Sequence, residues 1–338
     1  MTTASAPLAT TTPEAVGGHT RWARNPWVVF LIRRLARLLV SLAVLVTIAF
    51  LMIHLIPGDP VRAALGINAP ADLVEARRES LGLNDPIVVQ YVNYVQALFS
   101  GDMGVSMTSG VAVSETIGQR LPASASLAVC AFAVVMIVSI PLGLCMAVLT
   151  RGGRRRGAEL GFTSTSAVVA AIPEFLLAVG LVFVFGVTLD WFPVAGREGA
   201  SSYVLPVIAL SIGPALLMAR IVRVEALSVL GQDFVRTARA KRLPPWRVYF
   251  RHVFPNALTS TLTIGGLLLS AMIVGTVLVE NVFAWPGMGM TIVQSILAKD
   301  YPLVQGIVLV YGVAVLLVNL VVDLMLAVVD PRSTIREA

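Results

Sequence analysis

Long apolar segments alternate with short polar ones along the chain, and six of the apolar segments are long enough to cross a membrane. A helix needs roughly 20 apolar residues to span the hydrocarbon. The six predicted spans are residues 36–57, 124–149, 161–187, 204–224, 259–279 and 304–329. Pro141, Pro173 and Pro214 fall inside them, which is tolerated because neighbouring helices can satisfy the freed carbonyls. We therefore expect an all-α protein with six transmembrane helices.

The connection between the first two spans, residues 58–122, is too long for a simple link. Residues 69–81 have helical spacing, with acidic side chains suited to a first turn. Residues 87–99 place apolar side chains along one helical face, and turn sequences follow each segment. This pattern predicts a small helical segment outside the membrane.

A second long connection, residues 228–258, is basic and lies between the fourth and fifth spans. Its pattern predicts a short helix over 235–241, preceded by the charge of Asp233. The pair Pro244-Pro245 stops that helix and redirects the chain, and residues 246–258 return toward the fifth span. A loop with two short helices is longer than topology requires, which indicates that it contacts a partner.

Composition agrees with a membrane protein. The chain is 57% hydrophobic and 13% charged, with a mean hydropathy of +0.85, whereas soluble domains are about a quarter charged. Cys130 and Cys145 share one apolar segment and do not form a disulfide framework. The net charge is +6, but the basic residues border the spans, so membrane lipid and not nucleic acid is the expected partner.

The distribution of basic residues predicts the orientation. With both termini in the cytoplasm, 19 of the 25 lysine and arginine residues lie in inner segments. The basic loop then faces the cytoplasm. Residues 1–26 are expected to be a disordered cytoplasmic tail, and residues 330–338 a second cytoplasmic tail. The first apolar run is too long for a signal peptide and should remain as a span.

The sequence lacks the residues that an enzyme of a common class would need. His19, His54 and His252 are far apart, and no zinc, thiol or serine-hydrolase motif is present. Neither Lys241 nor Lys299 lies in a phosphate-binding loop. No metal site and no cofactor are expected, and the chain should not hydrolyse ATP by itself. Energy would come from a partner or from an ion gradient.

Few ionisable residues lie deep in the spans. Glu174 and Asp323 are the strong candidates, and Glu280 lies near a span end. An ion relay would need more ionisable residues inside the spans. An ion-coupled secondary transporter or channel is the alternative function from another class of protein.

Asp323 with Asn319 is expected to join helices. Glu174 has a polar partner, faces a wet cavity, or contacts a substrate amine or a gate. His54 is read as interfacial, with metal contact as the alternative.

Four stretches resemble one family. They are Arg33-Arg34-Leu35 through Pro57-Gly58-Asp59-Pro60; Leu81 to Pro86 with Gly101-Asp102-Met103-Gly104; Asp233 to Lys241; and Glu280 with Trp285-Pro286-Gly287-Met288-Gly289, followed by Asp330-Pro331-Arg332. The chain is similar to permease subunits of binding-protein-dependent ABC importers of the dipeptide, oligopeptide and nickel branch, the B-type permeases. The likeness covers about residues 30–332.

The resemblance implies a type I ABC importer transmembrane domain in the plasma membrane of a prokaryote. Its partners would be a second homologous permease, two cytoplasmic ATPase domains that bind ATP and magnesium, and an extracytoplasmic peptide-binding protein. Residues 27–122 would hold the first span and outer helices, and 123–329 the core. The ATPase-coupling residues implied are Asp233, Phe234, Arg236, Thr237, Ala238, Arg239, Ala240, Lys241, Arg242 and Pro255.

Two further sets of site residues are expected. Pro173 and Glu174 would lie on the substrate pathway, and Trp285, Pro286 and Gly287 would face the external binding protein. The expected cargo is a dipeptide or oligopeptide, with nickel or a nickel chelate as the alternative.

The sequence departs from the family pattern at three positions. Arg242 stands thirteen residues before Pro255, where the family motif has a glycine. Either Arg242 bears a positive φ, at a cost of about 1–2 kcal/mol, or the turn forms differently with help from Pro244. Glu174 replaces a small or apolar residue, and Leu326 a frequent tyrosine.

Overall fold

The computed structural model describes residues 26–55, 60–66, 68–80 and 82–329. These residues form helices joined by short connections, with one isolated β-bridge between Val105 and Ala112. The predicted tails, 1–26 and 330–338, lie outside the described residues except for Pro26, which begins the first helix. Residues 57–59 and Leu81, which belong to the family-like stretches, also lie outside.

Within the described residues, five helices are long and apolar enough to cross a membrane, and a bent pair supplies a sixth span if it is counted as one. The long helices are α1 (Pro26–Leu55), α5 (Val113–Thr150), α8 (Val204–Leu230), α11 (Phe254–Val282) and α13 (Tyr301–Val329), and the bent pair is α6 (Arg156–Ala171) with α7 (Glu174–Leu181). A π-helical segment, Val182–Thr188, continues α7. The chain is therefore an all-α membrane protein, as predicted.

The third predicted span, 161–187, is not continuous, which corrects the sequence reading. The axes on either side of the break differ by 91°. Pro173 disfavours helical backbone in the residue before it, and Ile172 is extended, with ψ 121°. Pro141 and Pro214 remain inside α5 and α8, because those helices continue through them.

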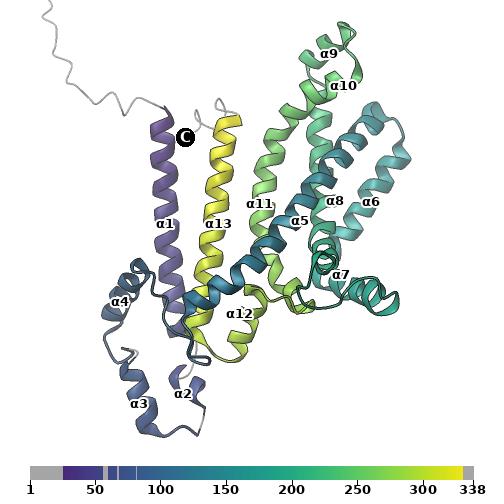
Figure 1. Cartoon of the computed structure of the whole chain (residues 1–338). Coiled ribbons are helices and arrows are strands. Elements are labelled where there is room, and N and C mark those ends of the chain that lie inside the picture. The colour runs from purple at the N-terminus through teal and green to yellow at the C-terminus, as the bar shows by residue number, and fades with distance from the viewer. Residues whose placement is uncertain (1–25, 56–59, 67, 81, 330–338) are drawn as a thin grey trace, which may run out of the picture.

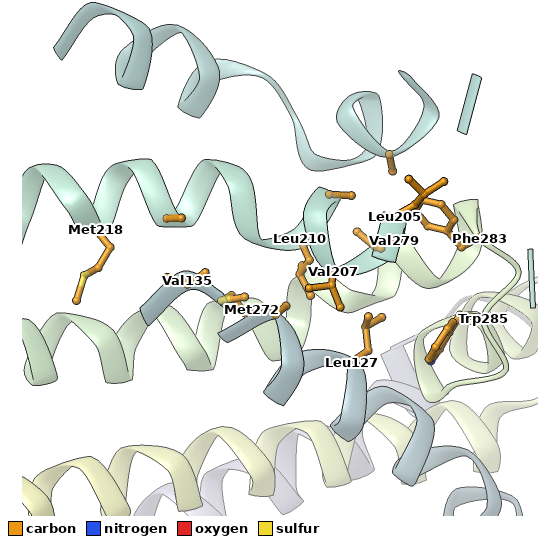
Figure 2. Close-up of a cluster of buried hydrophobic side chains, with 14 of the residues drawn as sticks. Leu127, Val135, Leu205, Val207, Leu210, Met218, Met272, Val279, Phe283 and Trp285 are labelled. Atoms are coloured by element: carbon orange, nitrogen blue, oxygen red, sulfur yellow. The ribbon is translucent and has the colours of Figure 1, made fainter. Parts of the chain in front are cut away.

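The largest buried cluster joins α5, α8 and α11, and α7 adds Ala178 (Figure 2). Leu127 of α5, Leu210 and Met218 of α8 and Met272 of α11 are almost completely buried in it. Burying side chains of this size stabilises a fold by about 1.5–3 kcal/mol each in water. In a membrane, close packing of such side chains takes over this role. These three helices form the rigid centre of the molecule.

Helices α1 and α13 form a pair at the side of this core (Figure 1). Arg34 of α1 and Asp323 of α13 form a salt bridge of 2.5 Å, and Ser270 of α11 donates a hydrogen bond to Asn319 of α13 at 3.2 Å. The prediction that Asp323 and Asn319 join helices is confirmed. Much of the remaining surface of α1 is apolar and exposed, as expected for a lipid-facing helix.

The two ends of the bundle carry different structures (Figure 1). The loop end carries α9 (Asp233–Ala240) and α10 (Pro245–Val248), and the described chain also begins and ends there. The opposite end, called the cap end, carries α2 (Pro60–Leu65), α3 (Ala71–Ser80), α4 (Ile87–Phe99) and α12 (Met288–Leu297). Helices α3 and α4 match the predicted segments 69–81 and 87–99.

Two hydrogen bonds hold α4 against α1. Nε2 of His54 lies 3.1 Å from Oε1 of Gln90, and Oγ1 of Thr47 lies 2.9 Å from the hydroxyl of Tyr91. Nδ1 of His54 is 3.2 Å from the carbonyl of Phe50 in its own helix. His54 therefore joins α1 to the cap, and this contact accounts for a polar residue at that position.

Candidate functional site

Helix α9 has one buried face and one exposed face. Val235 is 0% exposed and Ala238 is buried beside it, in a cluster with Ala226 of α8, Val248 of α10 and Ala257 of α11. The cluster is a second apolar core at the loop end, and α5 contributes Ala147 to it. Because α9 shares this core with three spans, a displacement of α9 must displace them too.

The predicted coupling residues lie mostly on the other face of α9. Ala238 is in the buried base, and Arg239 is half-buried, with Nη2 enclosed and without a hydrogen bond to any described residue. The exposed members are Asp233, Phe234, Arg236, Thr237, Ala240, Lys241 and Arg242, and Pro255 is exposed at the start of α11. The structure thus presents most of the set on one accessible surface.

Arg242 adopts the left-handed conformation expected of a glycine, with φ 53°. Its N–H donates to the carbonyl of Arg239 at 2.8 Å, and the N–H of Leu243 donates to the carbonyl of Ala238 at 3.3 Å. These two bonds form a Schellman motif, and Leu243 packs against the buried cluster that contains Ala238. Of the two alternatives for this turn, Arg242 bears the positive φ.

A polar network next to this loop joins α5, α6 and α8. Nη2 of Arg223 forms a salt bridge of 2.6 Å with Glu159, and Nε donates to Oγ1 of Thr150 at 3.0 Å. Arg151 donates to the carbonyl of Leu230 at 3.3 Å, directly before α9. The sequence left open whether Arg223 has a role beyond membrane orientation, and the structure gives it this contact. Glu159, near the start of the third span, was the available signal.

The break between α6 and α7 places Pro173 and Glu174 together, at the start of α7. Glu174 is half-buried and makes no capping hydrogen bond to the N-terminus of α7. Its carboxyl group lies over Gly275 of α11, where an added Cβ would come within 3.0 Å of Oε2. The side chain of Leu210 of α8 borders the same position. No ion pair or hydrogen bond joins Glu174 to another residue that the structure describes.

The turn before α12 is built around a fully buried carboxyl group. Glu280 is 0% exposed, and its Oε2 accepts hydrogen bonds from the N–H groups of Gly289 at 2.7 Å and Met290 at 3.2 Å. Oγ of Ser124 accepts from the N–H of Met288 at 2.8 Å. These bonds satisfy N–H groups of the first turn of α12, which otherwise lack partners. Glu280 and Ser124 therefore cap α12 and fasten it to α5 and α11.

Trp285 completes this turn from inside the molecule, as Figure 2 shows. It is 0% exposed, its indole N–H donates to the carbonyl of Ala123 at 3.1 Å, and its ring meets Tyr203 edge-on at 4.6 Å. Gly287 is also buried. The expectation that Trp285 and Gly287 face an external protein is therefore not met, because these residues are enclosed by their own chain. Pro286, between them, is half-buried.

Two family profiles match the chain. Residues 139–335 match the binding-protein-dependent transport system inner membrane component, and residues 27–128 match the N-terminal part of such membrane components. The first match covers more than half of the chain. The protein is therefore an ABC-importer permease subunit that belongs to the binding-protein-dependent transport system inner membrane component family.

Relatives match over nearly the whole length. A Brucella suis protein, provisionally named as a peptide transport system permease, is 37% identical over 310 residues, which cover 89% of this chain and 98% of the relative. The glutathione transport system permease protein GsiC of Pectobacterium atrosepticum is 35% identical over 303 residues, covering 89% and 97%.

Among solved structures, the inward-facing MetNI methionine ABC transporter has a similar fold. The TM-score is 0.50, the sequence identity is 18%, and the match covers 63% of this chain and 95% of that one. At this identity the likeness concerns the fold. It places the present helix arrangement among ABC transporter membrane subunits.

Proposed function

We propose that this permease carries peptides into the cell and that ATPase subunits drive it by docking on the exposed face of α9. The observation that carries this proposal is the two-sided structure of α9. Val235 and Ala238 pack into a core shared with α5, α8 and α11, while Phe234, Arg236 and Thr237 remain exposed. A partner that binds the exposed face and moves it also moves the buried face, together with the spans that pack against that face.

The turn after α9 and the network beside it make this connection stiff. The two hydrogen bonds of the Schellman motif at Arg242 restrict the movement of α9 relative to α10. Arg223 ties α8 to Glu159 of α6 and Thr150 of α5, so these helices move together at the loop end. A stiff connection transmits displacement, whereas a loose loop would absorb it.

The proposed assembly follows from the family and from the charge distribution. The chain pairs with a second homologous permease, two ATPase domains hold ATP and magnesium, and an external peptide-binding protein delivers cargo. The chain itself binds no cofactor. Both termini and the loop end lie in the cytoplasm of a prokaryote, because the basic residues gather in those segments. The cap end lies outside the plasma membrane.

The proposed cargo is a dipeptide or oligopeptide. Relatives that match 89% of the chain are named for peptide and glutathione transport, and glutathione is itself a small peptide. Pro173 and Glu174 are proposed to line the pathway, because the span breaks there and leaves a carboxyl group without a partner among the residues that the structure describes.

A charge reversal on α9 tests the coupling role. Arg236→Glu alters the exposed face, and the Arg236–Asp233 pair that it removes is exposed and so adds little stability. We expect the complete transporter to lose ATPase subunits during gentle purification and to lose ATP-driven uptake. Arg154→Glu is the matched control, because Arg154 is exposed at the same end but lies outside the loop. Equal behaviour of the two variants would overturn the docking role of α9.

Uptake by vesicles that contain the complete transporter tests cargo and energy source together. Labelled dipeptides and oligopeptides should accumulate with ATP and continue when ionophores collapse the ion gradients. Uptake that stops when ionophores are added and does not depend on ATP would indicate the ion-coupled alternative. Uptake of nickel or a nickel chelate in place of peptides would identify the other branch of the family.

A further inference from the structure

The carboxyl groups of the spans differ in how they are satisfied. Asp323 pairs with Arg34, and Glu280 accepts two backbone hydrogen bonds. Glu174 has neither kind of partner among the described residues. An ionisable group at membrane depth is costly and therefore marks a pathway or a partner from another molecule. Among these three carboxyl groups, Glu174 is therefore the candidate for contact with another molecule.

The backbone at the break leaves carbonyl groups at the end of α6, while Glu174 itself stands at the N-terminal end of α7. Helix α6 ends at Ala171, and Ile172 returns a hydrogen bond only to the carbonyl of Val169. The last carbonyls of a helix lack partners in the helix and carry the negative end of its dipole. Broken helices of this kind supply cation sites inside membranes, since the freed carbonyls can face a ligand. The break therefore lies between the carbonyl end of α6 and Glu174, the first residue of α7.

The carboxyl group of Glu174 lies over Gly275, and a Cβ added at that position would come within 3.0 Å of it, so the glycine leaves space for this carboxyl group. Ala171 and Pro173, on either side along the chain, are exposed. Glu174 is half-buried, so it can be approached from outside while part of its surface is shielded from solvent. Shielding of this kind strengthens the attraction for a positive charge.

We propose that Glu174, with the carbonyl end of α6, binds the terminal ammonium group of a peptide as the peptide passes through the transporter. The ammonium group donates hydrogen bonds to the Glu174 carboxylate, and the glycine at position 275 leaves space for that carboxylate. This inference rests on the proposed function in peptide import. It makes Glu174 a specificity-determining residue of this chain.

Glu174→Gln tests the inference in vesicles that hold both permeases, the ATPases and the binding protein. Uptake is compared for one peptide with a free amino terminus and for its N-acetylated form. The ratio of variant to wild-type uptake is taken for each peptide, so the preference of the binding protein cancels. We expect a loss of about tenfold or more for the free peptide, the loss typical of a charged hydrogen bond, and little change for the acetylated one. Glu174→Asp, which keeps the carboxylate, should restore much of the uptake.

A pair of glycine variants tests the space over Gly275. Gly275→Ala places a methyl group against the Glu174 carboxyl group and should reduce uptake of the free peptide selectively. Gly265→Ala in the same helix is the control, because its Cβ would meet Met218 at an ordinary 3.6 Å. Equal effects of the two variants would contradict a role for this space.

Several results would overturn the inference. Unchanged uptake of the free peptide by Glu174→Gln would do so, and so would equal losses for the free and acetylated peptides. Loss of the second permease from the purified variant complex would show that Glu174 instead pairs across the subunit interface. If wild-type vesicles take up no peptide, the proposed function itself fails, and this inference fails with it.

Discussion

The turn at Glu280 and the break at Glu174 place similar groups in opposite circumstances. Each contains a proline, and each places a glutamate beside the start of a helix. At the turn, Glu280 is enclosed and accepts hydrogen bonds from Gly289 and Met290. At the break, Glu174 is half-buried and without such bonds. The comparison teaches that the first carboxyl group holds the fold together, whereas the second is available to another molecule.

Gly289→Ala should have the largest effect on the free energy of unfolding, because it introduces a side chain into the turn before α12. An added Cβ would lie 2.5 Å from Cα of Val277, a backbone atom that cannot move aside without shifting α11. We expect a loss of about 3 kcal/mol or more in the free energy of unfolding. Thermal unfolding of the purified protein in detergent measures it. Gly180→Ala is the control, since nothing lies within 4 Å of its added Cβ, and equal melting of both variants would contradict the close approach.

Glu280→Ala should destabilise nearly as much. It leaves the N–H groups of Gly289 and Met290 without their acceptor inside the protein. Hydrogen bonds to a charged group contribute about 1.5–3 kcal/mol. The same melting assay should show Glu280→Gln as the milder variant, because glutamine keeps one acceptor oxygen. Wild-type stability in Glu280→Ala would mean that the turn does not depend on this carboxyl group.

Arg242→Gly extends the comparison to the loop end, where backbone strain is at issue. Glycine adopts the φ of 53° without steric cost, so α9 should become more stable by about 1 kcal/mol. Slower hydrogen exchange of the α9 amides would report this gain. Lys241→Gly, at φ −73°, should have the opposite effect. If Arg242→Gly exchanges at the wild-type rate, the turn stores no strain at this residue.

Glu174→Gln should have the smallest effect on stability, within about 0.5 kcal/mol, because no hydrogen bond within the described part of the chain depends on it. In the same melting assay it should resemble the wild type, while Glu280→Ala does not. Destabilisation as large as that of Glu280→Ala would remove the distinction between the two carboxyl groups and would give Glu174 a structural role.

Much of the fold could be predicted because membrane spans are local features. Each span needs its own run of apolar residues, so the limits of α1, α5, α8, α11 and α13 follow approximately from the sequence. Helix α9 also follows from local spacing and from the proline pair after it. The family-like motif over Asp233 to Lys241 indicated its role.

The sites were less predictable, because they depend on which residues meet in space. The kink at Pro173 was read as tolerated, since proline occurs both in continuous and in broken spans, and only packing against α8 and α11 distinguishes the two. Trp285 was expected to face the external binding protein, because it lies in one of the family-like stretches between two spans. Its contacts with Ala123 and Tyr203 come from segments more than eighty residues earlier in the chain.

The sequence by itself determined a multi-pass helical membrane protein with a long basic loop and a family-like coupling motif. Apolar runs, basic borders and helix breakers act over short distances, so they can be read directly from the chain. Only the tertiary structure decided which carboxyl groups find a partner. Oε2 of Glu280 meets the start of α12 and Asp323 meets Arg34, whereas Glu174 meets Gly275 and finds no donor among the described residues. Whether a carboxyl group finds a partner depends on its neighbours in space, and the packing of the helices selects those neighbours.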